Sequence, residues 1–223
     1  MSEAAPPVVL IVEDHVLLST TLSMALQAQG VEARRCHEGT PDAVRAAIAG
    51  VAPGVALVDV DLGLGPAGEP LNGVDLVPVL VGNGWRVVVM TGSAPEAEIA
   101  RAVTAGAAGW VYKTAPFPEL LSAVLDTVAG RAVLSETERL RLAQVHHVDQ
   151  ARGRARRAGI DLLTAREREV LDGLVAGKRA STIAEESVVS LATVRAQIRA
   201  ILAKLGVSSQ LEAVALVREL DLK

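Results

Sequence analysis

Aromatic residues are scarce in this 223-residue chain, which has two Trp, one Tyr and one Phe. Its hydrophobic cores must therefore be built from Ala, Val and Leu. The single cysteine, Cys36, excludes an internal disulfide and a zinc site made of several cysteines. No run of about 18 apolar residues occurs, which argues against a membrane-spanning helix. Residues 1–7 lack the charged and then apolar segments of a signal peptide, so we expect a cytoplasmic protein that does not contact the membrane.

Basic residues are also few in the first part of the chain, and the charge is unevenly distributed. Residues 1–130 carry a net charge of −8, residues 131–159 carry +4, and residues 160–223 are neutral, which gives −4 overall. A chain that is acidic overall is not an obvious nucleic-acid binder. Any contact with DNA must therefore come from basic residues in particular places.

Strand-like and helix-like segments alternate through residues 1–130. Strands are predicted at 8–12, 31–35, 55–59, 86–90 and 109–112. Helices are predicted at 16–29, 41–49, 73–81, 96–105 and 117–129. Such alternation indicates βαβ units, and it predicts an α/β fold with a doubly wound, five-stranded parallel sheet.

Polar residues stand where these apolar runs end. Asp59 ends the central run, Glu13 and Asp14 follow the first, Thr91 follows the fourth, and Lys113 follows the fifth. The carboxyl ends of parallel strands line one edge of a sheet, so these side chains should converge on one crevice. Carboxylates there can bind a hard divalent cation, and the cation and the amine can neutralise a phosphoryl group.

This set of residues resembles the receiver domain of two-component response regulators, a flavodoxin-like fold. The resemblance implies that Asp59 accepts a phosphoryl group from a sensor histidine kinase or a small acyl phosphate. It also implies Mg²⁺ as the cofactor, held by Glu13, Asp14, Asp59 and the backbone carbonyl of Asp61. Lys113 and Thr91 would bind the phosphoryl oxygens, and Trp110 would be the switch aromatic. Only autophosphotransfer and autodephosphorylation are expected, with no other enzyme activity.

The segment 131–159 is expected to link two domains. Ser135 and Glu138 form a possible capping box, and the stretch to Gln150 could be helical, although its apolar stripe is thin. The arginine-rich stretch 152–159 is interpreted as a solvated hinge with a basic end, with direct phosphate contact as the alternative.

Residues 160–223 predict a small all-α domain of four short helices. Thr164 and Glu167 form a capping box for the first helix, and Gly206 should end the third. The third helix has its apolar residues on one face, namely Val194, Ile198, Ile201 and Leu205. Its outer face carries Arg195 and Arg199, which can reach guanine edges or phosphates in a major groove.

Three blocks of this region, 163–171, 193–195 and 201–207, resemble a LuxR-type helix-turn-helix. The resemblance implies binding to double-stranded DNA through Arg195, Arg199, Ala196, Thr193 and Arg179. Gln197 departs from the histidine, and Ala192 from the basic or polar residue, that many members carry at these positions. A small helical protein-docking module is the alternative.

The whole chain thus resembles the NarL/FixJ class of response regulator. The expected organisation is a receiver at 1–130, a partly helical linker at 131–159 and a DNA-binding domain at 160–223. Phosphorylation is expected to control DNA binding and the formation of a homodimer that fits paired half-sites.

The stretch 62–72 departs from the receiver pattern. The glycine that usually lies about eight residues beyond the phosphoacceptor is Gly73, fourteen residues beyond Asp59, so roughly six residues look inserted. Gly and Pro predict a loop, which should overhang the crevice. Either it slows or shields phosphotransfer, or it is a tolerated surface insertion.

Two other interpretations stay open. The pattern Asp59-Val60-Asp61 imitates the D-x-D of haloacid-dehalogenase-like phosphatases, although their nucleophile normally lies on the first strand. Alternatively, the receiver is degenerate and serves as a dimerisation module without being phosphorylated. The insertion favours that interpretation, and the intact set of pocket residues opposes it.

Overall fold

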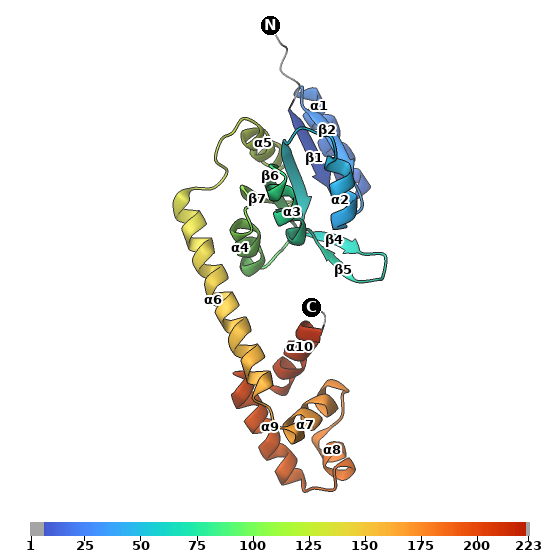
Figure 1. Ribbon diagram of the computed structural model, residues 1–223, viewed down its shortest axis with the longest axis vertical. Coiled ribbons are helices and arrows are strands. Elements are labelled where there is room, and N and C mark those ends of the chain that lie inside the picture. The colour runs from blue at the N-terminus through green and yellow to red at the C-terminus, as the bar shows by residue number, and fades with distance from the viewer. Residues whose placement is uncertain (1–6, 222–223) are drawn as a thin grey trace. The chain divides into compact units, whose positions relative to one another are not determined.

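The computed structural model describes residues 7–221, which divide into two compact units between His147 and Val148. Figure 1 shows a sheet flanked by helices in the first unit and only helices in the second.

The first unit is built on five parallel strands in the order β2-β1-β3-β6-β7. Their bounds are β1 Val8–Val12, β2 Glu32–Cys36, β3 Val55–Asp59, β6 Arg86–Thr91 and β7 Gly109–Tyr112. The strand order reverses between β1 and β3, as it does in doubly wound folds. The predicted fold class is therefore confirmed, and all five predicted strands are present within one residue of their expected ends.

Helices cover both faces of this sheet. They are α1 Val16–Ala28, α2 Pro41–Ile48, α3 Val77–Gly82 with the preceding 3₁₀ turn η1 Gly73–Leu76, α4 Glu96–Thr104 and α5 Phe117–Val128. Because side chains alternate along a strand, β1 and β3 contribute to a separate core on each face. One core packs against α2 and α3, and the other against α1 and α5. Both are made almost wholly of aliphatic residues, as the shortage of aromatics predicted.

The predicted loop at 62–72 is largely a β-hairpin, so that expectation was wrong in its secondary structure. Strands β4 Asp61–Leu64 and β5 Pro70–Asn72 pair antiparallel around a turn at 65–69. Gly73 follows the hairpin, and a Cβ there would lie 1.8 Å from the backbone oxygen of Asp59. Only glycine can therefore bring the chain this close to the end of β3.

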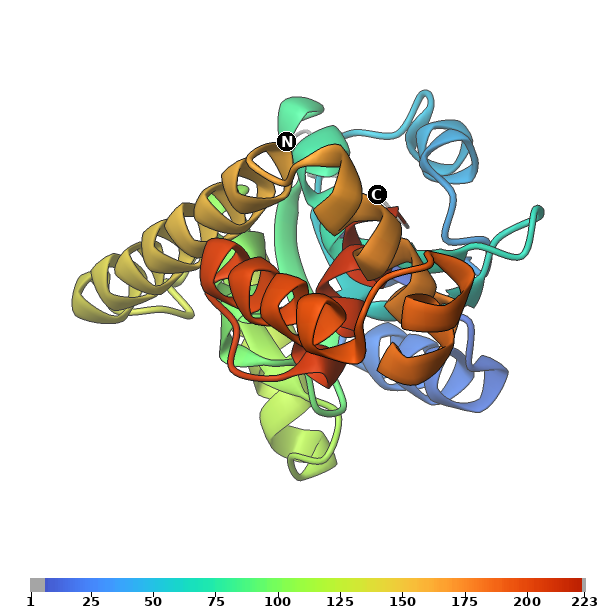
Figure 2. The same ribbon diagram turned by 90° about the horizontal axis from the view of Figure 1, so that it is seen from below.

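Helix α6, Glu136–Asp161, is continuous, which corrects the expected hinge at 152–159. Figures 1 and 2 both show it as one uninterrupted helix. Of the predicted capping box, one half is present, because the Glu138 amide donates to Ser135 Oγ at 3.2 Å. The carboxylate of Glu138 instead accepts hydrogen bonds from Arg141.

The first turns of α6 belong to the first unit. Leu142 is fully buried there in a cluster with Ile99, Ala100 and Val103 of α4. Trp110 of β7 lies against the same cluster. The contact compensates for the thin apolar stripe of α6, because one fully buried leucine anchors this part of the helix.

The second unit contains the end of α6 and four further helices, as the sequence predicted. They are α7 Ala165–Val175, α8 Ala180–Glu186, α9 Leu191–Leu205 and α10 Gln210–Asp221. Thr164 and Glu167 form the expected capping box, and Gly206 ends α9 in the left-handed conformation, at φ 65°. The apolar face of α9 (Val194, Ile198, Ile201 and Leu205) is buried.

Candidate functional site

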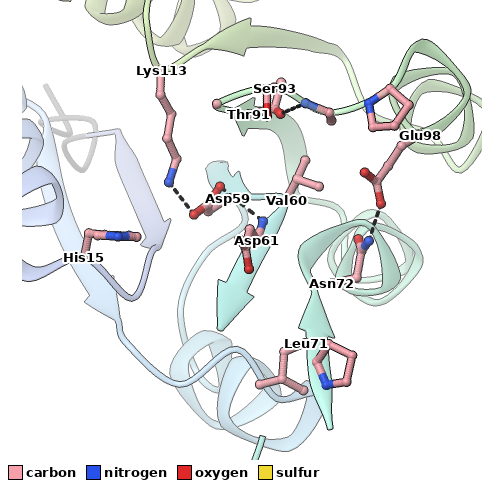
Figure 3. Close-up of a pocket in the computed structure, with 14 residues that line it drawn as sticks. His15, Asp59, Val60, Asp61, Leu71, Asn72, Thr91, Ser93, Glu98 and Lys113 are labelled. Atoms are coloured by element: carbon pink, nitrogen blue, oxygen red, sulfur yellow. Dashed lines mark hydrogen bonds and ion pairs between the residues drawn. The ribbon is translucent and has the colours of Figure 1, made fainter. Parts of the chain in front are cut away.

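Asp59 lies at the carboxyl end of β3, in the middle of the sheet, and its side chain is 1 % exposed. The Asp61 amide donates to its Oδ1 at 3.3 Å. Glu13 and Asp14 follow β1, Thr91 ends β6, and Lys113 follows β7, as the sequence predicted. Figure 3 shows Lys113 and Asp59 pointing toward one another across the crevice, with Thr91 on the neighbouring strand.

Lys113 contributes a cationic group to this crevice. Its Nζ donates to Asp59 Oδ2 and lies 2.8 Å from Glu13 Oε2. Burial raises the pKa of Asp59 to about 6, and the hydrogen bond from Lys113 opposes this shift. Burial lowers the pKa of Lys113, but its hydrogen bonds to Asp59 and Glu13 outweigh burial, so the pKa is raised overall. The ammonium group therefore stays charged where negative charge would accumulate.

Ligand atoms of Glu13, Asp14, His15 and Asp59 lie within 4.8 Å of one another. Glu13 Oε2 and Asp14 Oδ1 are buried; Lys113 Nζ lies 2.8 Å from the first and His15 Nδ1 2.8 Å from the second. Clustered carboxylates repel one another unless cations lie among them. An oxygen-rich site of this kind suits Mg²⁺, so three of the four predicted ligand residues fit a metal centre by their side chains.

His15 belongs to this cluster and was missed in the sequence analysis. Its Nδ1 lies 2.9 Å from Glu13 Oε1 and 2.8 Å from Asp14 Oδ1. The hydrogen bond with Glu13 and the charge of Asp14 raise the pKa of His15. Its position directly after the two acids was the available signal. The Asp61 carboxylate instead accepts from the Gly63 amide at 3.2 Å, and ligation by its backbone carbonyl stays a prediction.

Thr91 and Trp110 occupy different surroundings. Thr91 is 2 % exposed, and its Oγ1 accepts a hydrogen bond from the Ala94 amide at 2.7 Å. It lines the crevice. Trp110 does not line it, but packs on the cluster formed by α4 and Leu142 of α6. The two residues lie on the paired strands β6 and β7, and the role of Trp110 as the switch aromatic stays a prediction.

The hairpin β4–β5 forms one wall of the crevice, a cavity of about 620 Å³. Pro70, Leu71 and Asn72 line this wall. Asn72 Nδ2 donates to Glu98 Oε1, which ties the hairpin to the first turn of α4, and Figure 3 shows the two side chains facing one another. The inserted segment therefore overhangs the crevice, as expected.

Arg195 and Arg199 are exposed on the outer face of α9, and Ala192, Thr193 and Ala196 are exposed beside them. The Thr193 amide donates to Ser190 Oγ, so Ser190 caps the helix. Arg179 is also exposed, at the N-cap position of α8. Gln197 is half-buried, and its Oε1 has no hydrogen-bond partner among the described residues. The buried inner face and exposed basic outer face suit a helix that enters a groove.

Two family models match the chain. The model of the response regulator receiver domain matches residues 9–125, which is more than half of the chain. The model of bacterial regulatory proteins of the luxR family matches residues 161–217. This chain is a response regulator. Its receiver contains the crevice around Asp59, and its LuxR-type domain contains α9.

Curated relatives of this response regulator include transcriptional regulators. It is 29 % identical to the nitrate/nitrite response regulator protein NarL of Escherichia coli K12, over 98 % of each chain. It is 35 % identical to the probable transcriptional regulatory protein NarL of Mycobacterium tuberculosis, over 58 % of this chain and 57 % of that protein. These relatives confirm the NarL/FixJ class and favour a DNA-binding regulator over the phosphatase alternative.

Solved structures agree with the fold of this response regulator. The RcsB response regulator of Salmonella typhimurium has a TM-score of 0.50 and 18 % identity, over 96 % of this chain and 98 % of that one. A structure of two RcsB dimers bound to two parallel DNAs also has a TM-score of 0.50, at 17 % identity over the same shares. Within residues 7–221, no single helix of the regulator is long and apolar enough to cross a membrane; α9 with Gln210–Arg218 meets the criteria only as a pair bent by 58°.

Proposed function

We propose that this response regulator is phosphorylated on Asp59 and that phosphorylation controls its dimerisation and its binding to double-stranded DNA. The donor would be a sensor histidine kinase or a small acyl phosphate. An Asp59 carboxylate oxygen attacks the phosphorus atom, an acyl phosphate forms, and the bond from phosphorus to the donor atom breaks. The observation that carries the proposal is the pairing of Lys113 with both Asp59 and Glu13 at the carboxyl edge of the sheet.

Mg²⁺ would be held by the carboxylates of Glu13, Asp14 and Asp59 and by the Asp61 carbonyl. Bound there, it would neutralise charge on the transferring group. The ligand atoms of Glu13, Asp14 and Asp59 lie within 4.8 Å of one another, which supports this placement. Lys113 would bind the phosphoryl oxygens, and the Thr91 hydroxyl would donate to the same oxygens, because it is the acceptor in its bond with the Ala94 amide and its proton is free.

The signal would then pass through α4. Thr91 precedes this helix, and Trp110 packs behind it with Leu142 of α6. A shift of the loop 92–95 toward the phosphoryl group would move α4 and disturb the cluster around Leu142. The first turns of α6 would therefore transmit the conformational change of the receiver to the rest of the chain.

DNA would be read by α9. Arg195, near the N-terminal end of the helix, would contact a base edge, and Arg199, one turn later, a phosphate. Thr193, Ala196 and Arg179 would complete the surface. The RcsB protein, whose fold is similar, has been solved as dimers on DNA. A homodimer of this regulator would match paired half-sites in the same way.

The hairpin β4–β5 would set the lifetime of the phosphorylated state, because it walls the crevice and is tied to α4 by Asn72 and Glu98. Shortening the hairpin between Gly63 and Leu71 should change the rate of dephosphorylation and leave DNA affinity of the unphosphorylated chain unchanged. A change in that affinity with the lifetime fixed would contradict this role.

Labelling of the full chain with acetyl phosphate and Mg²⁺ tests the proposal. Intact-mass measurement should detect one phosphoryl group, which is stable in acid and lost in base. Asp59→Asn should take up none, and Lys113→Ala should keep the site but weaken the response. Wild-type labelling of Asp59→Asn would refute the assignment. An unlabelled wild-type chain that still binds DNA would instead favour the degenerate receiver, which the intact crevice opposes.

A further inference from the structure

The turn between α8 and α9 contains a backbone conformation that its residue does not favour. Val188 has φ 54° and is the only non-glycine residue with positive φ among residues 7–221. A β-branched side chain clashes with its own backbone in this region, so valine is seldom found there. The turn lies directly before α9 (Figure 1).

The hydrogen bonds identify the motif. The Val188 amide donates to Glu185 O at 3.2 Å, and the Val189 amide donates to Ala184 O at 3.0 Å. This pair of bonds defines a Schellman ending, in which the left-handed position is usually glycine. The same pair of bonds closes other helices of this chain, and each of these places glycine at that position. They are α1 with Gly30, α3 with Gly84, α4 with Gly106, α5 with Gly130, α7 with Gly177 and α9 with Gly206.

The conformation of Val188 is imposed by its neighbours. Val189 packs against the core of the second unit. Arg166 of α7 donates from Nη2 to the oxygen of Ser187 at 3.1 Å, and Ser190 caps α9. The turn is therefore fixed on both sides, and Val188 cannot adopt an ordinary extended or helical conformation without breaking these contacts.

The valine side chain does not stabilise the fold by packing, because it is 91 % exposed. An apolar side chain that costs strain and packs against no part of its own unit is explained if it packs against a partner. The side chain emerges two residues before the cap of α9, at the end of the helix where Ala192, Thr193 and Arg195 are also exposed.

We propose that Val188 contacts DNA and reads the 5-methyl group of a thymine in the major groove. The inference rests on the proposed insertion of α9 into that groove. The thymine methyl is the apolar group that base edges present there, and small apolar side chains recognise it. Val188 would thus be a specificity-determining residue that acts beside the arginines of α9, and its strain would be retained for binding.

The first test compares stability and affinity in the full chain. Val188→Gly and Val188→Asn should raise the Tm of the second unit by about 4 °C or more, since glycine and asparagine tolerate this conformation. Both should bind a duplex selected by the wild-type chain from a random pool about fivefold more weakly, as expected for the loss of one or two methyl contacts. Val188→Ala should lose less affinity than these two variants, because its methyl group can still contact the thymine methyl, and its Tm should rise less.

Gly177→Val is the matched control for strain. Gly177 occupies the same position at the end of α7, and a Cβ there would meet no atom within 4 Å. The substitution should lower the Tm by an amount similar to the gain from Val188→Gly, and it should leave DNA affinity unchanged. If neither Val188→Gly nor Gly177→Val changed the Tm relative to wild type, valine would not be strained at this position of the motif.

The second test replaces thymine with uracil in the selected duplex, which removes only the methyl group. Wild type should lose about fivefold at one position, and Val188→Gly should lose nothing further there. If all Val188 variants bound the selected duplex with wild-type affinity, the proposed contact would be excluded. If Val188→Gly bound the uracil duplex more weakly than wild type by the same factor as the thymine duplex, Val188 would not recognise the thymine methyl. If the wild-type chain enriched no duplex, the proposed DNA binding would fail, and this inference with it.

Discussion

Replacing Lys113 with methionine tests the electrostatics of the crevice, because the substitution keeps an unbranched side chain, one heavy atom shorter, and removes its charge. Lys113 donates to Asp59 and lies 2.8 Å from Glu13, and it is 19 % exposed. A hydrogen bond to a charged group contributes about 1.5–3 kcal/mol, and loss of one partner of a buried ion pair costs about 3–5 kcal/mol. Allowing for its partial exposure, we expect the free energy of unfolding to fall by about 2–4 kcal/mol.

Thermal unfolding followed by tryptophan fluorescence measures this change. Both tryptophans, Trp85 and Trp110, lie in the first unit, so the signal reports that unit alone. The Tm should fall by about 4–16 °C. Mg²⁺ should raise the Tm of Lys113→Met more than that of wild type, because the ammonium no longer competes for the carboxylates.

A substitution in an exposed ion pair supplies the control. Arg101 is 39 % exposed and pairs with Asp75, which is 64 % exposed, so Arg101→Met should cost only about 0–1 kcal/mol. The reasoning is refuted if Lys113→Met is no less stable than this control. Equal stabilisation of wild type and Lys113→Met by Mg²⁺ would also contradict a shared site for the two cations.

Three further predictions concern other elements. Leu142→Ala should weaken docking of α6 by about 2–5 kcal/mol, seen as faster hydrogen exchange confined to 136–147, and unchanged exchange there would contradict the role of this leucine. The hydrogen bond from Lys204 lowers the pKa of Glu167 to about 2, so the stability it contributes is present above about pH 4.5 and lost as the pH falls toward 2. Glu167→Gln should flatten the pH dependence of Tm in that window, and a parallel pH curve would refute the linkage. Arg195→Ala should reduce the binding free energy by about 1–3 kcal/mol and relax specificity at one base pair. Arg199→Ala should weaken binding to all duplexes alike and reduce the slope of log K against log salt concentration by about one unit. Wild-type affinity in both variants would show that α9 does not bind the DNA.

The sequence was sufficient for features set by local patterns. Apolar runs predicted β1, β3, β6 and β7, because strands buried on both faces are continuously hydrophobic. The residues that end these runs predicted the crevice, because parallel strands bring their carboxyl ends to one edge. In the second unit, the spacing of apolar residues in α9 and the capping box at Thr164 predicted both the buried face and the start of α7.

Features that depend on tertiary contacts were not predictable in this way. Helix α6 has a thin apolar stripe, and its first turns are secured by Leu142 against α4, a contact distant in sequence. The hairpin β4–β5 contains three glycines and two prolines between Leu62 and Asn72, which mask its short strands. The strain at Val188 depends on the contacts of Ser187 and Val189, so composition gives no sign of it.

The central claim is that the phosphoryl group on Asp59 controls DNA binding. The most direct measurement is the Kd of the full chain for its selected duplex, with and without prior incubation with acetyl phosphate and Mg²⁺, in wild type and in Asp59→Asn. Wild type should bind about 5-fold to 150-fold more tightly after phosphorylation, the usual range of allosteric coupling, and Asp59→Asn should not respond. An unchanged Kd in phosphorylated wild type, or an equal response in Asp59→Asn, would contradict the account.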